Sequence, residues 1–592
     1  MLGIIHRQIK RGILYVKKKL TDRQFLLFSC VVVGVSTSLA AIALKLFVFK
    51  LEELFFGGIH AGNVLWYQML LPMLGIGISS LLIVKVFKGK FLKGNDKIVY
   101  AIAKEGSNLP RSQTYSHLLT SSVTVGLGGS AGLESPMVAT GAAIGSTFGR
   151  IYYLSYKERT VLLACGIASG IASAFSAPIA GVLFALEVLM IDITINTFIP
   201  LIISAASGAL LAKIILGSNI LLSFNNMQAF NYNNTLFYIV LGLLAGVTAL
   251  YYARAFTWIE RKFAVMQSPV KKWLIGSALL AALIFFFPPL FGEGYSTIKI
   301  LADTNKIDKL PILFPHLEKS WVLLLFLLAL ILFKVFATGF TLQGGGNGGS
   351  FAPALFIGGV LGFFAAQLFH LMGYQNAPTA NFIIAGMAGM LSGLFFAPLT
   401  AIFLIAEITG GYGLIIPLML VSAISFFVVK SFEPLSMEMK KLSEHSTLNP
   451  SDKDKFLLSR LELIRMIDKT YLYFLPTATI ADLRNKMIND TKDAYAVIDE
   501  KQKLLGTLYL GDLKSIILDK DIKTDAVILS DVMTKTLPLS TKDTVESALY
   551  RFDQSEKQLL PVVNDENQWL GFITKSAILE EYRMEILRAS FN

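Results

Sequence analysis

The sequence is poor in the residue types that support catalysis, metal binding and disulfide cross-linking. Only 16% of its 592 residues are charged, and it contains two cysteines and six histidines. Both cysteines, Cys30 and Cys165, lie in apolar segments, so no disulfide framework is expected. The histidines stand at no metal-ligand spacing, and no nucleophile–base constellation occurs in the apolar region. The sequence therefore predicts neither a metal site nor an enzyme.

Apolar residues are abundant instead. They make up 54% of the chain, and the mean hydropathy is +0.60. Apolar runs recur from about residue 25 to about residue 430, which leaves room for well over ten membrane segments at roughly 20 residues each. Several runs are interrupted by Gly or Pro, so half-helices are expected among them. These features predict a polytopic membrane protein.

The net charge of +12 does not indicate nucleic-acid binding. Basic residues gather in "HRQIKRGILYVKKK" near the start and in short connections such as "RKF" and "KKW". This placement is typical of the cytoplasmic flanks of membrane helices. We therefore expect both termini on the cytoplasmic side of the cell membrane, with an even number of full crossings.

The apolar region contains an internal repeat. "GIASGIASAFSAPIAGVLFALEV" (166–188) aligns without a gap to "GMAGMLSGLFFAPLTAIFLIAEI" (386–408), at an offset of 220 residues. Just upstream, "GGSAGLESP" (128–136) aligns to "GGNGGSFAP" (345–353), at an offset of 217. Duplicated halves with interrupted helices are typical of transporters that bind their substrate where the halves meet.

Each "GG…P" stretch allows a helix to begin inside the membrane. The unpaired N–H groups and the dipole of such a start favour an anion, whereas a cation would need carboxylates or carbonyl oxygens. The first stretch also contains a lone acid, Glu134, and an ionisable residue at such a depth is usually functional. The alternative is that the glycines only allow close packing of helices.

These motifs resemble those of the CLC family of chloride channels and chloride/proton exchangers. "GLESP" is similar to the family's G-R-E-G-P, "GGSFAP" is similar to its G-x-F-x-P, and two "AP…E" segments follow at the expected places. The resemblance implies a homodimer in which each subunit has its own anion pathway, and it makes Glu134 the gating glutamate. A carboxylate at a helix N-terminus competes with chloride for the same amides. The alternative is that Glu134 only caps its helix.

The family pattern also predicts the residues that hold the anion. It places anion-binding backbone amides at Leu133, Glu134, Ser135, Ser350 and Phe351. Backbone donors need no particular side chain, so Leu133 and Ser135 can replace the family's Arg and Gly.

At the inner side of the pathway the sequence departs from the family. The family's G-S-G-I-P aligns best with "GNDKI", which puts Asn95 at the position of the anion-binding Ser; an amide N–H can still donate to an anion. Replacements at this position also occur in the family's fluoride-exporting branch. Chloride and fluoride therefore both stay open as substrates.

Two further departures concern protons. Exchangers of the family carry a proton-transfer glutamate directly after the Glu of the first "AP…E" segment, where this chain has Val188, and this favours a channel. Glu187 stays a candidate for the proton route, although a structural role like that of its repeat partner Glu407 is favoured. The family's anion-facing Tyr corresponds to Glu438 in "SMEMKKL". We hypothesise that Glu438 replaces the missing proton carrier; the alternative is an ordinary solvated helix residue.

The region after the apolar part repeats a second pattern twice, namely a helical stretch, a short apolar strand, a turn and another strand. This resembles a tandem pair of CBS domains, which often bind adenine nucleotides through a Thr/Ser and an Asp three residues apart. The first copy keeps Asp512 but has Tyr509 at the hydroxyl position; the second keeps Thr574 but has Ala577 at the acid position. Nucleotide binding and a purely dimerising scaffold both stay open.

The expected fold is an all-α polytopic membrane protein with duplicated, inverted halves, followed by a small α/β CBS pair. The expected segments are a basic N-terminus (1–22), the transport domain (23–440, with repeats of roughly 23–220 and 235–440), a linker (441–467) and the CBS pair (468–592). The expected function is transport of chloride or a similar small anion, gated by Glu134 and regulated by the CBS tail. A proton-coupled exchanger of other selectivity is the main alternative, and a CBS-regulated cation transporter the weaker one.

Overall fold

A computed structural model gives the fold of the chain in two compact units, Met1–Glu444 and His445–Asn592. It describes the chain except residues 1–11, 14, 57–69, 89–90, 190–194, 218–221, 223, 225–226, 304–319, 375–376, 411, 446–457, 459–460, 489, 519–525 and 591–592. Most of the expected basic N-terminus and of the expected linker lies outside the described residues. The boundary between the units falls between Glu444 and His445, a few residues after the expected end of the transport domain.

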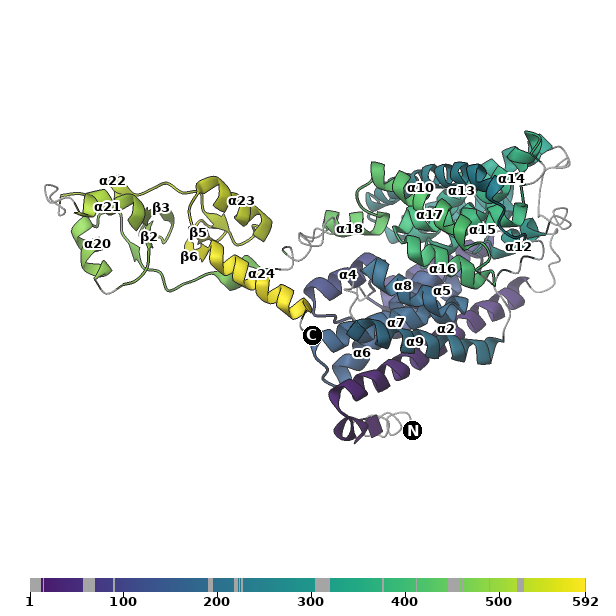
Figure 1. Cartoon of the computed structure of the whole chain (residues 1–592), viewed down its shortest axis with the longest axis horizontal. Coiled ribbons are helices and arrows are strands. Elements are labelled where there is room, and N and C mark those ends of the chain that lie inside the picture. The colour runs from purple at the N-terminus through teal and green to yellow at the C-terminus, as the bar shows by residue number, and fades with distance from the viewer. Residues whose placement is uncertain are drawn as a thin grey trace. The chain divides into compact units, whose positions relative to one another are not determined.

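The first unit is built from helices in two successive groups, which form separate lobes in the ribbon view (Figure 1). The first group is α2 (Asp22–Phe56), α3 (Leu71–Leu81), the π-helical turn η2 (Leu82–Val86), α4 (Asn95–Lys104), α5 (Gln113–Gly126), α6 (Glu134–Ile151), α7 (Tyr156–Phe175), α8 (Pro178–Leu189) and α9 (Ile195–Leu216). The second is η3 (Tyr232–Asn234), α10 (Thr235–Ala264), α11 (Pro269–Phe286), η4 (Pro288–Leu290), α12 (Tyr295–Ala302), α13 (Ser320–Gln343), α14 (Phe351–Leu371), α15 (Thr379–Phe395), α16 (Pro398–Ile408) and α17 (Ile415–Phe432), and α18 (Met437–His445) follows.

Among the described residues, eight helices are long and apolar enough to cross a membrane. Four shorter apolar helices accompany them, at Leu71–Val86, Pro178–Val188, Thr379–Phe395 and Pro398–Ile408. The prediction of interrupted, shorter membrane helices therefore agrees with the structure, since three of the four short helices belong to the repeated segments.

The internal repeat extends through the glycine contacts between helices. In the first half, the backbones of α6 and α7 touch at Gly141 and Gly166, so closely that a Cβ at either position would collide with the backbone of the other. In the second half, Gly358 of α14 and Gly386 of α15 make the same contact. These four glycines, which lie outside the two "GG…P" stretches, therefore serve close packing between helices.

The glycines before α6 and α14 differ from these packing glycines. Gly128 has φ = 92° and its repeat partner Gly345 has φ = 110°, conformations that side-chain-bearing residues rarely adopt. They turn the chain back sharply at the ends of α5 and α13, so that α6 and α14 can begin within the membrane unit. One group of glycines thus allows helices to pack closely, and the other allows the chain to turn.

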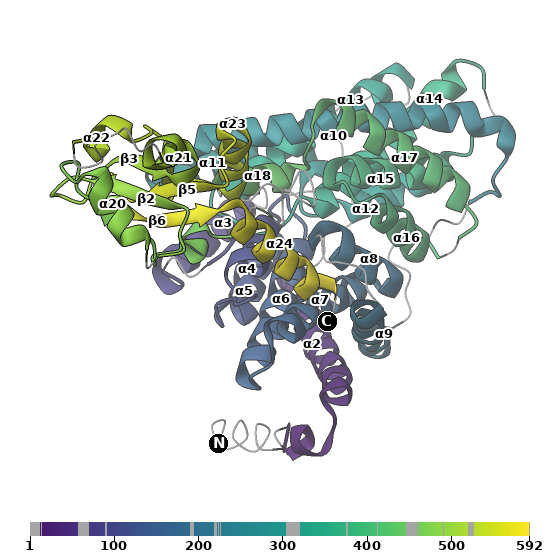
Figure 2. The ribbon, with the colours of Figure 1, turned by 60° about the vertical axis from the view of Figure 1, so that its left-hand side comes forward.

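The second unit contains two three-stranded sheets, each flanked by helices (Figure 2). The first holds β1 (Tyr473–Phe474), β2 (Ala494–Ile498) and β3 (Leu504–Tyr509), and the second holds β4 (Leu539–Ser540), β5 (Leu559–Val563) and β6 (Trp569–Thr574), each in that order. In each sheet the first pair is parallel and the second antiparallel. The helical elements are η6 (Leu463–Met466), α20 (Ile480–Met487), α21 (Leu510–Leu518), α22 (Leu529–Val532), α23 (Val545–Ser555) and α24 (Lys575–Ser590).

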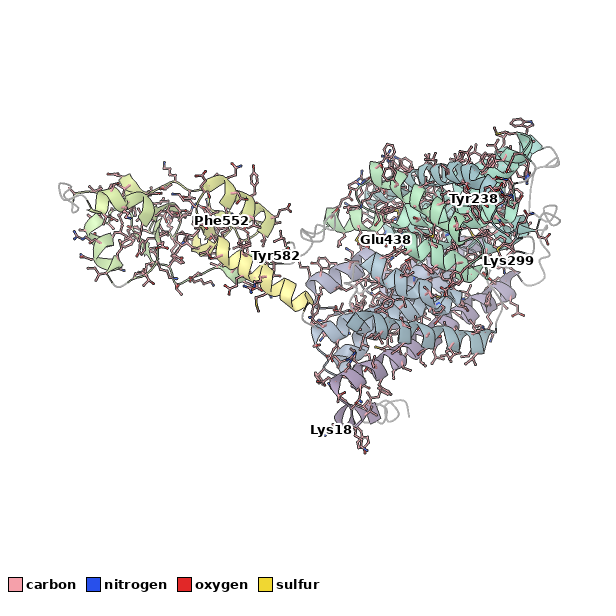
Figure 3. All side chains as sticks on the ribbon, in the orientation of Figure 1. Lys18, Tyr238, Lys299, Glu438, Phe552 and Tyr582 are labelled. Atoms are coloured by element: carbon pink, nitrogen blue, oxygen red, sulfur yellow. The ribbon has the colours of Figure 1, made fainter. Side chains whose placement is uncertain are left out.

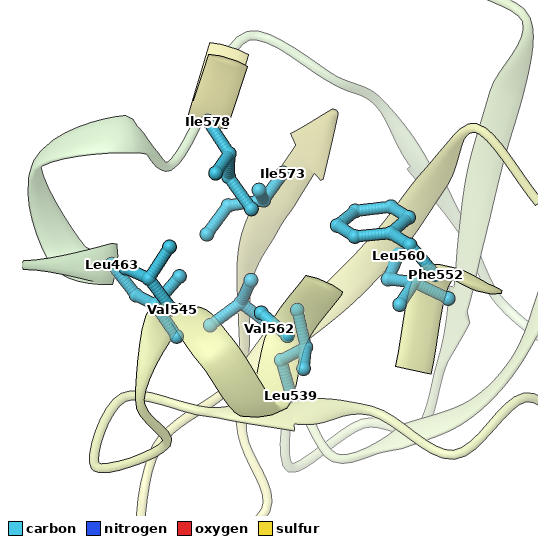
Figure 4. Close-up of a cluster of buried hydrophobic side chains, with 9 residues drawn as sticks. Leu463, Leu539, Val545, Phe552, Leu560, Val562, Ile573 and Ile578 are labelled. Carbon is cyan, nitrogen blue, oxygen red and sulfur yellow. The ribbon is translucent and has the colours of Figure 1, made fainter. Parts of the chain in front are cut away.

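Each copy of this unit has its own apolar core. In the second copy Phe552 of α23 packs with Leu560, Val562 and Ile573 of the sheet and with Ile578 of α24 (Figure 4). A shared cluster that includes residues of both sheets joins the copies, and an isolated bridge pairs Lys503 with Gln568. This arrangement agrees with the α/β pair predicted from the sequence.

Candidate functional site

The two glycine-rich stretches meet at one point of the membrane unit. Gly132 donates its N–H to the carbonyl of Gly349 at 2.9 Å, and Gly349 donates back to Gly132 at 2.8 Å. These residues are 217 positions apart, which is the repeat offset, so the contact lies on the approximate two-fold axis between the halves. The helices that follow, α6 and α14, therefore start side by side.

A second pair of contacts crosses the same axis. The hydroxyl of Thr124, at the end of α5, accepts the N–H of Asn347 at 3.0 Å. Its repeat partner Thr341, at the end of α13, accepts the N–H of Ser130 at 3.1 Å. Each half thus holds the glycine loop of the other half, so both halves are needed to bring the two helix starts together.

The predicted anion-binding residues gather at these helix starts. Leu133 and Ser350 are the residues just before α6 and α14, and Glu134, Ser135 and Phe351 open the two helices. The amides in a first helical turn have no intrahelical acceptor, so they can bind a small anion between the helices.

Apolar rings form one wall of this space. The ring of Phe351 packs against those of Phe175 and Phe395, with centroids 5.7 and 5.4 Å apart, and Phe175 and Phe395 are themselves repeat partners at the ends of α7 and α15. Water is therefore kept from this side of the site, which strengthens hydrogen bonds made by the amides.

Glu134 is 4% exposed and occupies the space between the two helix starts. Its Oε1 accepts a 2.8 Å hydrogen bond from the hydroxyl of Tyr295, at the start of α12. Its Oε2 has no hydrogen-bond partner among the described residues, and it lies against Gly132, close to the amide nitrogen of Ala352 in α14. The carboxylate thus reaches from its own helix toward the start of the other helix, where an anion would sit.

The sequence motifs did not indicate Tyr295 and Glu293, which approach the site from the start of α12 and from the loop before it. The Leu133 N–H, one of the predicted anion donors, points at Glu293 Oε1 at 3.2 Å. The motif "GEGY" does hold an acid between two glycines, one of which, Gly294, has φ = 94°. This pattern could have indicated a functional loop, but nothing in the sequence indicates that the loop contacts residue 133.

Asn95 and Glu438 meet at a second position, on α4 and α18. Asn95 is the first residue of α4 and is 3% exposed, and its Nδ2 donates to Glu438 Oε2 at 2.7 Å. Figure 3 marks Glu438 near the start of α18. The two side chains that the family alignment assigned to the inner anion site are therefore in direct contact, and Glu438 is not an ordinary solvated residue.

The "AP…E" glutamates exchange contacts between the halves. Glu187 of α8 accepts the N–H groups of Leu399 (3.1 Å) and Thr400 (2.8 Å) at the start of α16, together with the Thr400 hydroxyl (2.6 Å). Glu407 of α16 accepts the N–H groups of Ile179 (3.1 Å) and Ala180 (2.9 Å) at the start of α8. Each carboxylate caps the helix of the other repeat, which is the arrangement that a structural role requires.

In the CBS region the nucleotide-binding candidates make contacts within the protein. Asp512 pairs with Lys557 through contacts of 2.6 and 2.9 Å, and the ammonium also lies 4.6 Å from the centre of the Tyr509 ring. Burial raises the pKa of Tyr509 above its usual range. Thr574 accepts the N–H of Ala577 at 3.0 Å at the start of α24. A ribose or phosphate would have to displace these contacts.

Comparison with known proteins follows the same division of the chain. A profile described as "Voltage gated chloride channel" matches residues 75–430, and a CBS-domain profile matches residues 464–519 and 529–583. The chain belongs to the CLC family. Among curated CLC relatives, "Putative chloride channel protein ClcB-like" of Ralstonia nicotianae is 29% identical over 60% of this chain and 80% of its own length. "Voltage-gated ClC-type chloride channel ClcB" of Escherichia coli is 26% identical over 70% and 98%.

Exchangers also occur among the relatives of this CLC protein. "H(+)/Cl(-) exchange transporter ClcA" of Vibrio cholerae is 28% identical over 52% of this chain and 65% of its own length. Among solved structures, "a slow cyanobacterial Cl-/H+ antiporter" matches with a TM-score of 0.60 and 22% identity over 72% of this chain and 98% of its own. "A eukaryotic CLC transporter" matches with a TM-score of 0.60 and 17% identity, over 93% and 97%. At these identities the solved structures support the fold alone.

Proposed function

We propose that this CLC protein moves chloride, or a small monovalent anion like it, through a pathway gated by Glu134. The observation that carries the proposal is the meeting of the two helix starts at Gly132 and Gly349, with the carboxylate of Glu134 in the space between them. The amides of two opposed helix N-termini favour an anion over a cation. Glu134 is then a tethered anion in the place of a mobile one.

Gating follows from competition for the same donors. While it is ionised, the Glu134 carboxylate is held at this position by the helix starts and by the Tyr295 hydroxyl. Protonation removes the negative charge that those donors favour, and a mobile anion can then replace the side chain. A rise in anion concentration or a fall in pH therefore opens the pathway.

The contacts that bring the two helix starts together join the two halves of a single chain, so one subunit can carry a complete pathway. From membership of the CLC family we propose a homodimer with two such pathways in the cell membrane, and from the basic flanks of the helices we propose that both termini are cytoplasmic. We propose the CBS pair as a regulatory module. Its Asp512 and Thr574 are held by contacts within the protein, so a nucleotide would have to displace these contacts to bind there.

Proton coupling is a second candidate, favoured by the contact of Asn95 with Glu438. Val188 cannot carry a proton, but Glu438 is a titratable group at the position assigned to the inner anion site. In this mechanism an inner proton reaches Glu438, and breaking its contact with Asn95 frees the amide to donate to an anion. The protein would then exchange anions for protons without the usual inner glutamate.

The test uses purified protein in liposomes under an outward chloride gradient, with external chloride and external pH recorded together. Chloride efflux that is changed by Glu134→Gln supports the proposed function. Proton movement against its own gradient, abolished by Glu134→Gln, establishes exchange, and efflux without proton movement establishes a channel. Absence of chloride, bromide, nitrate and fluoride flux from folded wild-type protein would refute anion transport.

A further inference from the structure

Glu293 is a second carboxylate at the anion site, and the gating mechanism described above gives it no role. It lies between Gly292 (φ = 59°) and Gly294 (φ = 94°), in the loop that joins η4 to α12. Both glycines adopt conformations that are unfavourable for other residues. The backbone on both sides of Glu293 is thus shaped to bring this residue to the start of α6.

The contacts of Glu293 interlock with those of Glu134. The N–H of Leu133 donates to Glu293, while the next residue, Glu134, accepts from Tyr295, which lies two positions after Glu293. Glu293 and Tyr295, two positions apart, therefore hold the adjacent residues Leu133 and Glu134. Glu293 accepts the hydrogen bond of the Leu133 amide, which the anion pathway needs as a donor. In the same way, Glu134 occupies the space between the helix starts.

Charged groups from three elements face Glu293. Glu134 approaches from α6, Lys45 and Glu52 from α2, and Lys334 from α13. Lys334 is fully buried and donates to the carbonyls of Leu290 (3.0 Å) and Gly292 (2.9 Å), so its cation is fixed beneath the loop. A pair of carboxylates beside buried cations can hold one proton between them, because ionising both acids at close range is unfavourable.

Two of these acids are more accessible than Glu134. Glu52 and Glu293 are partly exposed, and Glu134 is buried. Lys45 lies 23 residues after Asp22, the first residue of α2, which corresponds to roughly 34 Å along the helix at 1.5 Å per residue. This group of charges is therefore far from the N-terminal end of α2. Within the pair of Glu134 and Glu293, Glu293 is therefore the more accessible acid.

The repeat shows that the fold does not require an acid at this position. "KGNDKI" before and within α4 corresponds to "EGYSTI" before and within α12, at an offset of 200, so Lys93 is the counterpart of Glu293. Lys93 also reaches into the other half, where it donates to the carbonyls of Leu342 and Gly346. The two halves thus place opposite charges at equivalent positions, and only the second half places an acid beside the gate.

We propose that Glu293 is a second tethered competitor of the anion pathway, which holds the Leu133 amide and exchanges the gating proton with Glu134. This inference rests on the proposed function. In the proton step, the O–H bond of protonated Glu134 breaks and an O–H bond forms on the Glu293 carboxylate, so that one carboxylate is protonated before and after the step. Glu134 then returns to the helix starts as the anion, and the proton leaves from the more accessible Glu293.

The test compares wild-type protein with Glu293→Gln, Glu134→Gln and the double variant in liposomes, with anion flux and proton flux recorded as a function of external pH. Glu293→Gln is expected to shift or flatten the pH dependence of anion flux, because one member of the proton pair is lost. The double variant is expected to carry at least threefold more anion flux than Glu134→Gln, because Glu293 no longer occupies the Leu133 amide. Glu293→Asp should restore part of the pH dependence.

Chloride binding measured by calorimetry gives an independent readout in the same protein. Removing a charged acceptor from the Leu133 amide should tighten chloride binding about tenfold, the effect of one hydrogen bond to a charged group. Glu53→Gln, a change at an exposed acid next to Glu52, is the control and should leave flux and binding unchanged.

The outcomes separate this inference from the function on which it rests. If wild-type protein moves no anion, the proposed function fails. If wild-type protein moves anions and Glu134→Gln changes gating, but Glu293→Gln behaves as wild type and the double variant as Glu134→Gln, the role of Glu293 is refuted alone. If Glu293→Gln does not fold, Glu293→Ala, which also removes the carboxylate, takes its place: an unchanged pH profile and unchanged chloride affinity refute the proposal.

Discussion

Replacing Glu187 by Ala should destabilise the membrane unit strongly, because its carboxylate caps the start of α16. The change leaves three donors without their acceptor, namely the amides of Leu399 and Thr400 and the Thr400 hydroxyl. Thr400 is buried, whereas Leu399 is exposed. An unsatisfied buried donor costs about 1–3 kcal/mol, and the hydroxyl can rotate toward another acceptor, so we expect a loss of about 3–4 kcal/mol in the free energy of unfolding.

The repeat provides a matched control for this experiment. Glu407→Ala removes the equivalent cap from α8, where two amides and no hydroxyl lose their acceptor, so about 2–4 kcal/mol is expected. Glu187→Gln keeps one acceptor oxygen and should lose only about 1–2 kcal/mol. The predicted order of stability is wild type, then Glu187→Gln, then Glu407→Ala, then Glu187→Ala.

The assay is unfolding of purified protein in lipid nanodiscs, followed by intrinsic fluorescence and size-exclusion chromatography. A double-mutant cycle of Glu187→Ala with Thr400→Val isolates the hydroxyl contact and should give a coupling energy of about 1 kcal/mol or more. Proton flux in liposomes is recorded for Glu187→Gln in parallel. A Glu187→Ala variant as stable as wild type would refute the capping role of Glu187. A Glu187→Gln variant that keeps wild-type stability but loses proton coupling would instead assign Glu187 to the proton route.

Three further predictions concern other parts of the chain. Glu438→Gln should abolish proton coupling and keep anion flux; if neither flux changes, the hypothesis for Glu438 is wrong. Gly132→Ala should alter anion flux at least tenfold, because the added Cβ collides with the Glu134 carboxylate, whereas Gly413→Ala, which meets open space, should not; equal fluxes would contradict this. In the CBS pair, the hydrogen bond from Lys492 lowers the pKa of Asp468 to about 2, so its stabilising effect should be complete above pH 4 and lost as the pH falls toward 2. Because the pair is partly exposed, Asp468→Asn should cost under about 1 kcal/mol at pH 7 in chemical unfolding, and a difference that persists at pH 2 would refute the assignment.

Much of the architecture could be predicted because the repeat preserves sequence where the backbone is under constraint. The offset of 220 identified Glu187 and Glu407 as repeat partners, and the structure shows that each of them contacts the other half. Glycine at a turn or a close helix contact cannot be replaced without strain, so glycine recurs at these positions in both halves of the sequence. The change from the apolar part to the polar tail followed from composition, and the CBS pair followed from the resemblance of the repeated pattern in the tail to that family.

The surroundings of Glu134 could be predicted only in part. Backbone amides at its helix start were identified from the motif, but Tyr295 and Glu293 were not, because they lie about 160 residues away in a loop without periodic pattern. The crossed contacts of Thr124 and Thr341 were missed for the same reason, since a Thr near a helix end is common. Such pairs depend on how the halves dock, which neither helical periodicity nor local motifs record.

The two-fold meeting of the glycine loops also bears on the direction of transport. A framework in which each contact has a reversed copy looks the same from either face of the membrane, so it has no intrinsic inward or outward sense. That sense must come from positions where the copies differ, and at the centre the counterpart of Glu134 is Phe351, an acid against an aromatic ring. An ancestor built from identical halves would have been indifferent to orientation, and a preferred direction of transport would have to arise from these few unmatched side chains.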